Sequence, residues 1–362
     1  MKLLNLLEKL DQIAPLRYAE SWDNVGLLAG DPAAEVSHAM LTIDFTAAVA
    51  QEAQAAGCDL VIAYHPPIFD AIKRLTAPSL LFDAIRRGVA IYSPHTALDV
   101  ADGGTNDMLA DVLGLKERSP LRHSLAPATQ FKLVTFVPAE SVDKVSQALF
   151  AAGAGRIGDY SSCSFRTSGE GTFFGQEGTN PAVGQSGRLE RVAEIRLETV
   201  VPIKNINQVI AALRQSHPYE EPAFDLNQLA AAPEERGMGR IGMLEPTPRA
   251  ELLARIKRGL RIEHLLVAGP TSGEVTKAAV CAGSCGGLLS DAISAGAQLF
   301  LTGEVRHHDA LKAAAAGMTV VCALHSNSER PVLERVQTRL RDLAPDLIVS
   351  VSREDRDPFV TA

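Results

Sequence analysis

Two similar stretches, far apart in the chain, decide the fold. Residues 52–72 read EAQAAGCDLVIAYHPPIFDAI, and they align without gaps on residues 291–311, which read DAISAGAQLFLTGEVRHHDAL. Each reads as the end of a helix, a glycine that terminates it, a buried strand and a polar strand end. A second hydrophobic strand follows in each half, at residues 88–92 and 317–324. Both halves therefore predict strand–helix–strand–helix units, typical of a mostly parallel α/β sheet covered by helices.

The segment between these halves has its own repeat. Residues 132–138 read KLVTFVP and precede a helical pattern at 142–152, while residues 196–202 read RLETVVP and precede one at 206–215. We expect each unit to end in a further strand. Two tandem strand–helix–strand units predict a small ferredoxin-like α+β domain.

The further strands are expected at residues 159–165 and 223–229, and the glycine-rich residues 169–187 are expected to form a loop. The chain is then divided into a first core half, an inserted domain and a second core half, at residues 1–128, 129–236 and 237–362. The inserted domain should fold around its own apolar core.

Composition excludes several classes of protein. The chain has 362 residues and a formal net charge of −8, and it lacks the concentrated Lys and Arg of a nucleic-acid-binding surface. No stretch approaches the roughly 18 apolar residues of a membrane span, and the N-terminus reads as an amphipathic helix rather than a signal peptide. Five scattered cysteines do not form a disulfide framework. We expect a cytoplasmic protein that binds neither membranes nor nucleic acids.

Potential metal ligands directly follow the predicted strands: His65, His95, Asp99, His325 and Glu329. In open α/β sheets, ligands bind beyond the carboxyl ends of the strands, and we expect all these groups at the same edge of one sheet. Imidazole together with carboxylate suits zinc, iron or manganese. The pattern predicts a metal site and favours a hydrolytic protein.

Most of these residues also have an ordinary structural interpretation. Two prolines after His65 must end the strand, so an ordinary half-exposed surface residue is an equally good interpretation of this histidine. For Asp99, a residue that stabilises a turn is an equally good interpretation. Ser326 or Ser328 is placed to cap a helix that starts near Glu329, which would then be an ordinary first-turn acid. The coincidence of so many groups at strand ends favours the metal site.

Other residues are candidates for supporting roles. The internal alignment places Glu304 opposite His65, which makes Glu304 a candidate site residue. His95 and Asp44 also follow predicted strands, where either could be catalytic or could orient a ligand. Trp22 is expected to be a packed anchor of its loop.

Together these residues closely resemble the NIF-three-like family (NGG-one-interacting factor three), whose members are often labelled GTP cyclohydrolase I type two homologs. The resemblance rests on SWDNVGL at 21–27, YHPPIF at 64–69, HTALD at 95–99, LTGEVRHH at 301–308 and HSNSER at 325–330. Residues 156–222 are similar to the inserted domain of the longer members. The resemblance implies a two-lobed duplicated α/β core, a ferredoxin-like insert related to the PII and CutA type, a dinuclear metal site and a ring-shaped homohexamer.

Carried over by motif, the resemblance implies metal ligands at His65, Asp99, His325 and Glu329. Glu329 would bridge two ions. Many bacterial members have two adjacent histidines where this chain has Tyr64 and His65, and a neutral tyrosine, with an ordinary pKa near 10, is a poor ligand. Tyr64 would have to coordinate as the phenolate. We expect divalent ions, zinc first with iron or manganese as alternatives, nearer one per chain than two, the better-held ion lying beside His65 and Asp99.

Two functions follow from this site. Water bound to a carboxylate-bridged metal pair has a lowered pKa, which supports a hydrolase of the GTP cyclohydrolase type acting on a nucleotide or related small molecule. His95 or Glu304 would transfer protons. The alternative is a non-enzymatic metal-binding adaptor or metal-handling regulatory protein whose insert senses a ligand. Tyr64 favours the alternative, and the clustered imidazoles and carboxylates favour the hydrolase.

Overall fold

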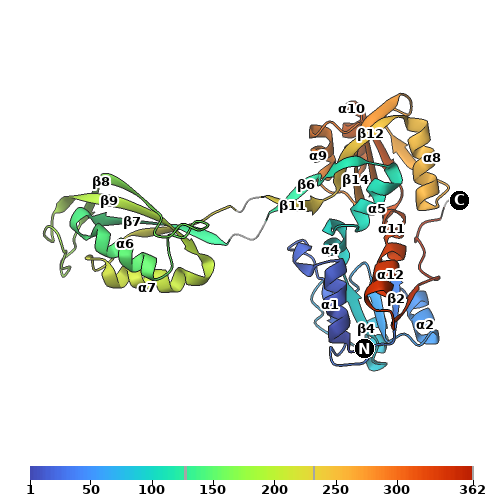
Figure 1. Cartoon of the computed structure of the whole chain (residues 1–362), viewed down its shortest axis with the longest axis horizontal. Coiled ribbons are helices and arrows are strands. Elements are labelled where there is room, and N and C mark those ends of the chain that lie inside the picture. Colours follow the sequence, from blue (N-terminus) through green and yellow to red (C-terminus); the bar gives the residue numbers. More distant parts are fainter. Residues whose placement is uncertain (126–128, 231–232, 361–362) are drawn as a thin grey trace. The chain divides into compact units, whose positions relative to one another are not determined.

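The computed structural model describes residues 1–125, 129–230 and 233–360 (Figure 1). The chain divides into two compact units, residues 1–124 with 234–362 and residues 125–233. Residue 128, where the sequence places the first boundary, lies outside the described residues. No described helix has both the length and the apolar character that crossing a membrane requires.

The larger unit is a mixed α/β fold with two main sheets. The strands of the first, in spatial order, are β1 (Gly26–Ala29), β4 (Ala90–Ser93), β3 (Leu60–Ala63), β2 (His38–Thr42) and β17 (Ile348–Val351). Those of the second are β13 (Leu266–Ala268), β16 (Thr319–Cys322), β15 (Leu299–Glu304), β14 (Glu274–Ser284), β12 (Arg240–Pro248) and β5 (Lys116–Ser119). Four neighbouring strands are parallel in the first sheet and three in the second.

Helices cover these sheets (Figure 1). They are α1 (Leu3–Ile13), α2 (Ala47–Ala55), α3 (Leu80–Arg86), α4 (His95–Val100), α5 (Thr105–Leu113), α8 (Arg249–Leu260), α9 (Leu288–Ser294), α10 (His307–Ala315), α11 (His325–Glu329) and α12 (Val332–Leu343), with a 3-10 turn at Leu16–Tyr18. The amphipathic spacing of α1 buries Leu3, Leu6 and Leu10 against Val336 and Leu340 of α12.

The repeated stretches occupy equivalent places in the two sheets. Strands β3 and β15, which the alignment pairs, each lie between two parallel neighbours. The expectation that all candidate ligands share the edge of one sheet is therefore wrong. The strands of the two copies are buried in separate apolar clusters, so the repeat produces two sheets.

The two sheets do not correspond to the two halves of the chain. From the first half, α5 and β5 join the second sheet: β5 pairs with β12, and Leu109 of α5 lies in one core with Ile256 of α8 and Val280 of β14. From the second half, α12 and β17 join the first sheet, where β17 pairs with β2. We call each of these sheets, with the helices that cover it, a lobe. Each lobe is therefore completed by elements from the other half of the chain.

The smaller unit has the order strand–helix–strand–strand–helix–strand. Its elements are β7 (Gln130–Pro138), α6 (Val142–Ala151), β8 (Ser164–Phe174), β9 (Leu189–Pro202), α7 (Ile206–Ser216) and β10 (Phe224–Gln228), with 3-10 turns at Ala139–Ser141 and Ile203–Asn205. The sheet order is β10-β7-β9-β8. Leu149 of α6 and Leu213 of α7 pack on Leu133 and Leu197 of the sheet. Strands β6 (Arg122–Leu125) and β11 (Pro233–Met238) form a separate two-stranded sheet.

One strand of the smaller unit differs from the prediction. Strand β8 occupies Ser164–Phe174 rather than 159–165, so part of the expected glycine-rich loop is strand. It pairs with β9 from Ser164 opposite Thr199 to Phe174 opposite Leu189. Glycine usually weakens a strand, but the 14-residue β9 offers a long partner, and cross-strand pairing outweighs the local preference.

Acid should destabilise the smaller unit through His217. Its Nε2 donates to the Phe136 carbonyl oxygen at 3.0 Å and its Nδ1 accepts from the Tyr219 N–H at 3.1 Å, an arrangement that only the neutral ring can make. Burial lowers the pKa of His217 below its usual 6.5. The unfolded state thus binds the proton more readily. Stability is fully present above pH 6.5 and is lost as the pH falls from there towards the folded-state pKa.

Hydrogen exchange of the α7 amides in the full chain, measured as the pH is lowered through this window, tests the expectation after correction for the intrinsic pH dependence of exchange. His217→Gln cannot titrate and should remove this step, whatever its own effect on stability. The same acid-induced loss of protection in both proteins would show that His217 is not responsible.

Candidate metal centre

The two lobes use the same local construction to present a pair of side chains. After β16 the backbone turns at Leu324, whose φ is 69°, and α11 begins at His325. After β4, α4 begins at His95, whose φ is 26°. In each short helix the histidine is followed four residues later by an acid, Glu329 or Asp99, on the same helix face.

The helix cap that the sequence predicts at Ser326 or Ser328 is wrong. Glu329 ends the short helix α11 and does not begin a longer one, and no side chain caps α11. Ser328 instead accepts a hydrogen bond from the Gly283 N–H at 2.8 Å and donates to the His325 carbonyl oxygen at 2.7 Å. The serine therefore ties α11 to the end of β14.

Three potential ligands face one another between the lobes. The Nε2 of His65 lies 3.2 Å from Oε2 of Glu329, and the Nε2 of His325 lies 3.2 Å from Oε1. The ligand atoms of these three residues all lie within 4.8 Å of one another. His65 comes from the first sheet, whereas His325 and Glu329 follow a strand of the second, so the site joins the two lobes.

Two of these atoms lack the hydrogen bonds that burial demands. The Nε2 of His65 and Oε2 of Glu329 are buried, and neither has a hydrogen-bond partner within the described part of the chain. They are 3.2 Å apart, but not in hydrogen-bond geometry. Leaving a buried polar atom unsatisfied costs roughly 1–3 kcal/mol. Two imidazoles and a carboxylate are donors that divalent transition metals prefer, so a cation between them fits this site.

Two glycines leave room for this group. A Cβ on Gly283 would lie 2.5 Å from Oε1 of Glu329 and 3.1 Å from Nε2 of His325. A Cβ on Gly303 would lie 2.9 Å from the Cα of His325. The sequence offered a signal for Gly303, because the internal alignment places it opposite Tyr64, but it offered none for Gly283.

Each site histidine has a carboxylate on its Nδ1. The pairs are His65 with Asp44 at 2.9 Å, His325 with Glu304 at 3.0 Å and His95 with Asp23 at 2.8 Å. A carboxylate on one ring nitrogen fixes the orientation of the ring and leaves the other nitrogen to act. The structure thus places Glu304 where it orients His325. Asp23 was not identified from the sequence, although it lies in the SWDNVGL motif.

Asp99 is held differently from the other expected ligands. It is buried, and its Oδ1 accepts a hydrogen bond from the hydroxyl of Tyr64, which is also buried. Thr105 lies behind this pair, with its Oγ1 3.4 Å from the Tyr64 oxygen. The structure groups His65 with His325 and Glu329, while Asp99 is paired with Tyr64.

The charges of the three-residue group favour cation binding at Glu329. Burial raises the pKa of Glu329, but His325 and His65 outweigh it, and the net pKa is lowered. Burial lowers the pKa of His65, whereas Asp44 and Glu329 raise it to about 10. Glu329 raises the pKa of His325 to about 9 despite burial. Glu329 therefore stays ionised, which is the form that binds a cation.

In the Tyr64–Asp99 pair, by contrast, the pKa values of both acids are raised. Burial, with the negative charge of Asp99 adding to it, raises the pKa of Tyr64 well above 10. Burial and the charge of Glu329 raise the pKa of Asp99 to about 6, although the hydrogen bond from Tyr64 lowers it. Tyr64 is therefore a neutral donor, which disfavours the phenolate that direct coordination would need.

Metal affinity should rise steeply with pH. Each imidazole must lose its proton to bind a cation, and the pKa values of His65 and His325 are raised to about 10 and about 9. Below these values, binding should release about two protons per ion, so the logarithm of the binding constant should increase by about two per pH unit. Calorimetric titration in buffers of different ionisation enthalpy measures the proton count. Release of no proton at neutral pH would contradict the assignment of these rings as ligands.

An exposed aromatic pair lies beside the site. Trp22 is 60% exposed and Phe69 is 51% exposed, with ring centroids 6.1 Å apart, and the Trp22 ring lies 6.3 Å from that of His95. The expectation that Trp22 is a packed anchor is wrong. The neighbouring Asp23 anchors the loop instead, through His95 and the backbone N–H of Thr96.

Comparison with known proteins gives consistent matches over the whole chain. A model of the Duf34/NIF3 family (NGG1p interacting factor 3) matches residues 1–358. A Halalkalibacterium halodurans protein named GTP cyclohydrolase 1 type 2 homolog is 37% identical over 373 residues, covering 99% of both chains. A Bacillus subtilis protein of the same name is 36% identical and covers 98% of this chain and 97% of its own. The crystal structure of a Bacillus cereus protein related to NIF3 covers 100% of this chain and 99% of its own, with a TM-score of 0.67 and 32% identity.

Proposed function

The chain belongs to the Duf34/NIF3 family, and on that basis we propose that it is a metal-dependent hydrolase of the cyclohydrolase type. The observation that carries the proposal is the group of His65, His325 and Glu329, with two buried ligand atoms that lack hydrogen bonds. Three protein ligands leave part of the coordination sphere of a divalent ion open, as in catalytic rather than structural zinc sites.

Each residue has a role in this proposal. His65 and His325 would hold the ion through Nε2, and the carboxylates on their Nδ1 atoms hold the rings in place. A bound divalent ion, zinc by the donor set with iron or manganese as alternatives, would supply Lewis acidity and lower the pKa of water. His95, whose ring centroid is 5.5 Å from that of His65, transfers protons between water and the leaving group.

A second ion position is part of the proposal. Asp99 would supply it together with Glu329, as the resemblance to the family implies. The hydrogen bond from Tyr64 competes for Asp99. We therefore expect one ion to be held tightly, by His65, His325 and Glu329 rather than beside His65 and Asp99 as expected from the sequence, and the second weakly.

The substrate in this proposal is a nucleotide or a related small molecule. The exposed rings of Trp22 and Phe69 beside His95 provide a surface on which a planar base can stack. Curated relatives carry the name GTP cyclohydrolase 1 type 2 homolog, so GTP is the first compound to test.

The experiment is a turnover assay of protein loaded separately with zinc, iron or manganese. GTP and a panel of purine compounds are incubated with each form, and ring opening is followed by loss of the purine ultraviolet band and by product mass. Turnover that disappears in His65→Ala supports the hydrolase. Tight metal binding without turnover of any compound would contradict it.

The Tyr64–Asp99 hydrogen bond favours a second candidate function. If it keeps the second ion position empty, the protein is a metal-binding regulatory or metal-handling protein whose inserted domain senses a ligand. The order of strands and helices in the smaller unit supports a ferredoxin-like insert of this kind. Resemblance also supports a homohexamer, which light scattering on the full chain tests.

A further inference from the structure

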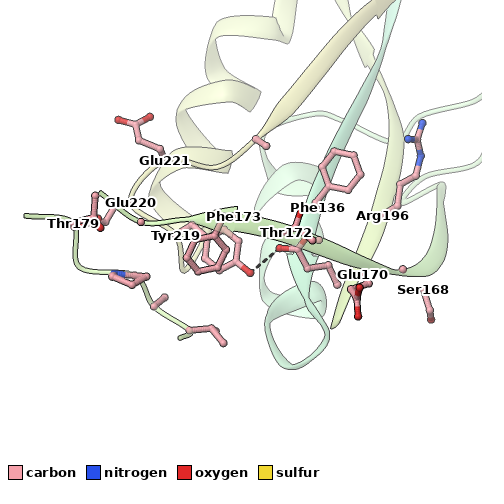
Figure 2. Close-up of a pocket in the computed structure, with 18 of the residues that line it drawn as sticks. Phe136, Ser168, Glu170, Thr172, Phe173, Thr179, Arg196, Tyr219, Glu220 and Glu221 are labelled. Carbon is pink, nitrogen blue, oxygen red and sulfur yellow. Dashed lines mark hydrogen bonds between the residues drawn. The ribbon is translucent and has the colours of Figure 1, made fainter. Parts of the chain in front are cut away.

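The smaller unit contains a cavity of about 630 Å³ (Figure 2). It lies on the face of the sheet that α6 and α7 do not cover. Leu197 of β9 packs on these helices, and side chains alternate along a strand, so Glu194 and Arg196 point to the opposite face. The segment before β10, with Tyr219, and the segment between β8 and β9 form the walls. The volume lies within the roughly 300–1,000 Å³ of small-molecule sites.

Two glycines of β8 hollow out the floor of this cavity. Gly169 lies opposite Glu194 in the ladder, and a Cβ on Gly169 would meet no atom within 4 Å. A Cβ on Gly171 would lie 2.1 Å from Oε2 of Glu194, so this glycine lets the carboxylate lie across the strand. Glycine is unfavourable within a strand unless something must approach the backbone closely. Here the space above Gly169 remains open.

The cavity combines aromatic rings with carboxylates. Phe136, Phe173 and Tyr219 line it (Figure 2). Tyr219 donates from its hydroxyl to Oε1 of Glu194 at 2.7 Å, which fixes the carboxylate. No described residue donates a hydrogen bond to Oε2, so that oxygen can accept one from a ligand.

The charged groups around the cavity are mostly acidic. The carboxylates are those of Glu194, Glu220 and Glu221, and the one cation in the lining is Arg196. Glu170 lies opposite Ala193 in the ladder and pairs with Arg191 on the other face of the sheet. Arg196 is paired with Glu198 at 2.8 Å, and its guanidinium lies 5.8 Å from the centroid of the Phe136 ring. The lining thus already holds one cation against an aromatic face, and Glu194 keeps no cationic partner among the described side chains.

We propose that this cavity binds an organic cation, a primary amine or guanidinium carried on a flat apolar body. The cationic group donates to Oε2 of Glu194, and the apolar body packs on Phe136, Phe173 and Tyr219. Thr167, which lies opposite Arg196 and also lines the cavity, is available to polar substituents. The proposal does not depend on the chemistry at the metal centre.

Three probes of the same size test the charge requirement. They are 2-phenylethylamine, 2-phenylethanol and phenylacetate, which at neutral pH are a cation, a neutral molecule and an anion. Titration into the full-length protein, followed by calorimetry or NMR, should show the amine binding at least about tenfold more tightly than the alcohol. Phenylacetate should not bind. Absence of amine binding at millimolar concentration, or equal binding of amine and alcohol, overturns the proposal.

Two variants locate the binding. Glu194→Gln keeps an acceptor for Tyr219 but removes the charge, so affinity for the amine should fall about tenfold while affinity for the alcohol is unchanged. Gly169→Val places a strand-compatible side chain in the open space and should abolish binding of both probes. Glu263→Gln, the same charge change at an exposed residue of the larger unit, should have no effect.

The alternative occupant of this face of the sheet is a second copy of the chain. Sedimentation of the same proteins tests this alternative. Probe binding that is lost in Gly169→Val with unchanged sedimentation supports the small-molecule site. Unchanged amine affinity in both Glu194→Gln and Gly169→Val overturns it. A fall in assembly size in Gly169→Val, without amine binding by the unmodified chain, assigns the face to self-association and likewise overturns the proposal.

Discussion

Glu329→Gln should lose most of its bound metal while keeping its fold. Glu329 lies between His65 and His325, 3.2 Å from the Nε2 of each, and it is only 3% exposed. The amide has nearly the same shape but lacks the negative charge and one of the two acceptor oxygens. Loss of an outer-shell partner alone costs roughly 10–100-fold in metal affinity, so loss of this central ligand should cost more. Elemental analysis after dialysis measures the metal that is retained.

His95→Gln is the matched control for Glu329→Gln. His95 begins α4 as His325 begins α11, but it lies outside the three-residue group. It should retain metal and lose turnover, since we assign it to proton transfer. Circular dichroism should show the same secondary structure in both variants. Equal metal retention in the two proteins would remove Glu329 from the site.

Tyr64→His should raise metal content from near one ion per chain towards two. The Tyr64 hydroxyl now occupies Asp99, and burial raises its pKa well above 10, so it does not coordinate as phenolate. A histidine would release Asp99 and add a neutral nitrogen donor next to His65. Metal titration of the variant should show a second binding step, and its affinity should increase with pH as the new imidazole loses its proton.

Tyr64→Phe separates the two effects of that substitution. It releases Asp99 without adding a ligand, and it removes a hydrogen bond to a buried carboxylate, which should cost roughly 1–3 kcal/mol of stability. A second binding step in Tyr64→His but not in Tyr64→Phe assigns the gain to the new imidazole. Two tightly bound ions in the unmodified chain would show that Tyr64 is no obstacle.

The sequence predicted which residues lie at strand ends, but not how the strands combine. Hydrophobic runs located β3, β4 and β16 within a few residues, since buried parallel strands are nearly continuous apolar stretches. Which sheet a strand joins depends on contacts with distant segments, and no local pattern records them. For that reason His65 and His325 were expected on one sheet, whereas the structure places them on two.

The side chains that surround the expected ligands could not be predicted for the same reason, because they come from distant segments. His325 and Glu329 are detectable because a four-residue spacing is a local pattern. Gly283 makes room for Glu329 from a strand more than forty residues away, and Asp23 reaches His95 across 72 residues. Such contacts become visible only when the fold brings the segments together. The strand β8 was misplaced for a related reason, because its glycines suit a loop locally and a ladder only beside β9.

Because each lobe contains elements from both halves of the chain, neither lobe can finish folding until both of these parts have been synthesised. The ribosome makes β2, β3 and β4 long before α12 and β17, which cover that sheet and pair with it. At about 5–20 residues per second, the roughly 250 residues between β4 and β17 take on the order of 10–50 s to translate. Throughout this interval β2 presents an unpaired edge, which invites pairing with other chains. His65 is made roughly 250 residues before His325 and Glu329, so metal loading has to wait until the second lobe has been made.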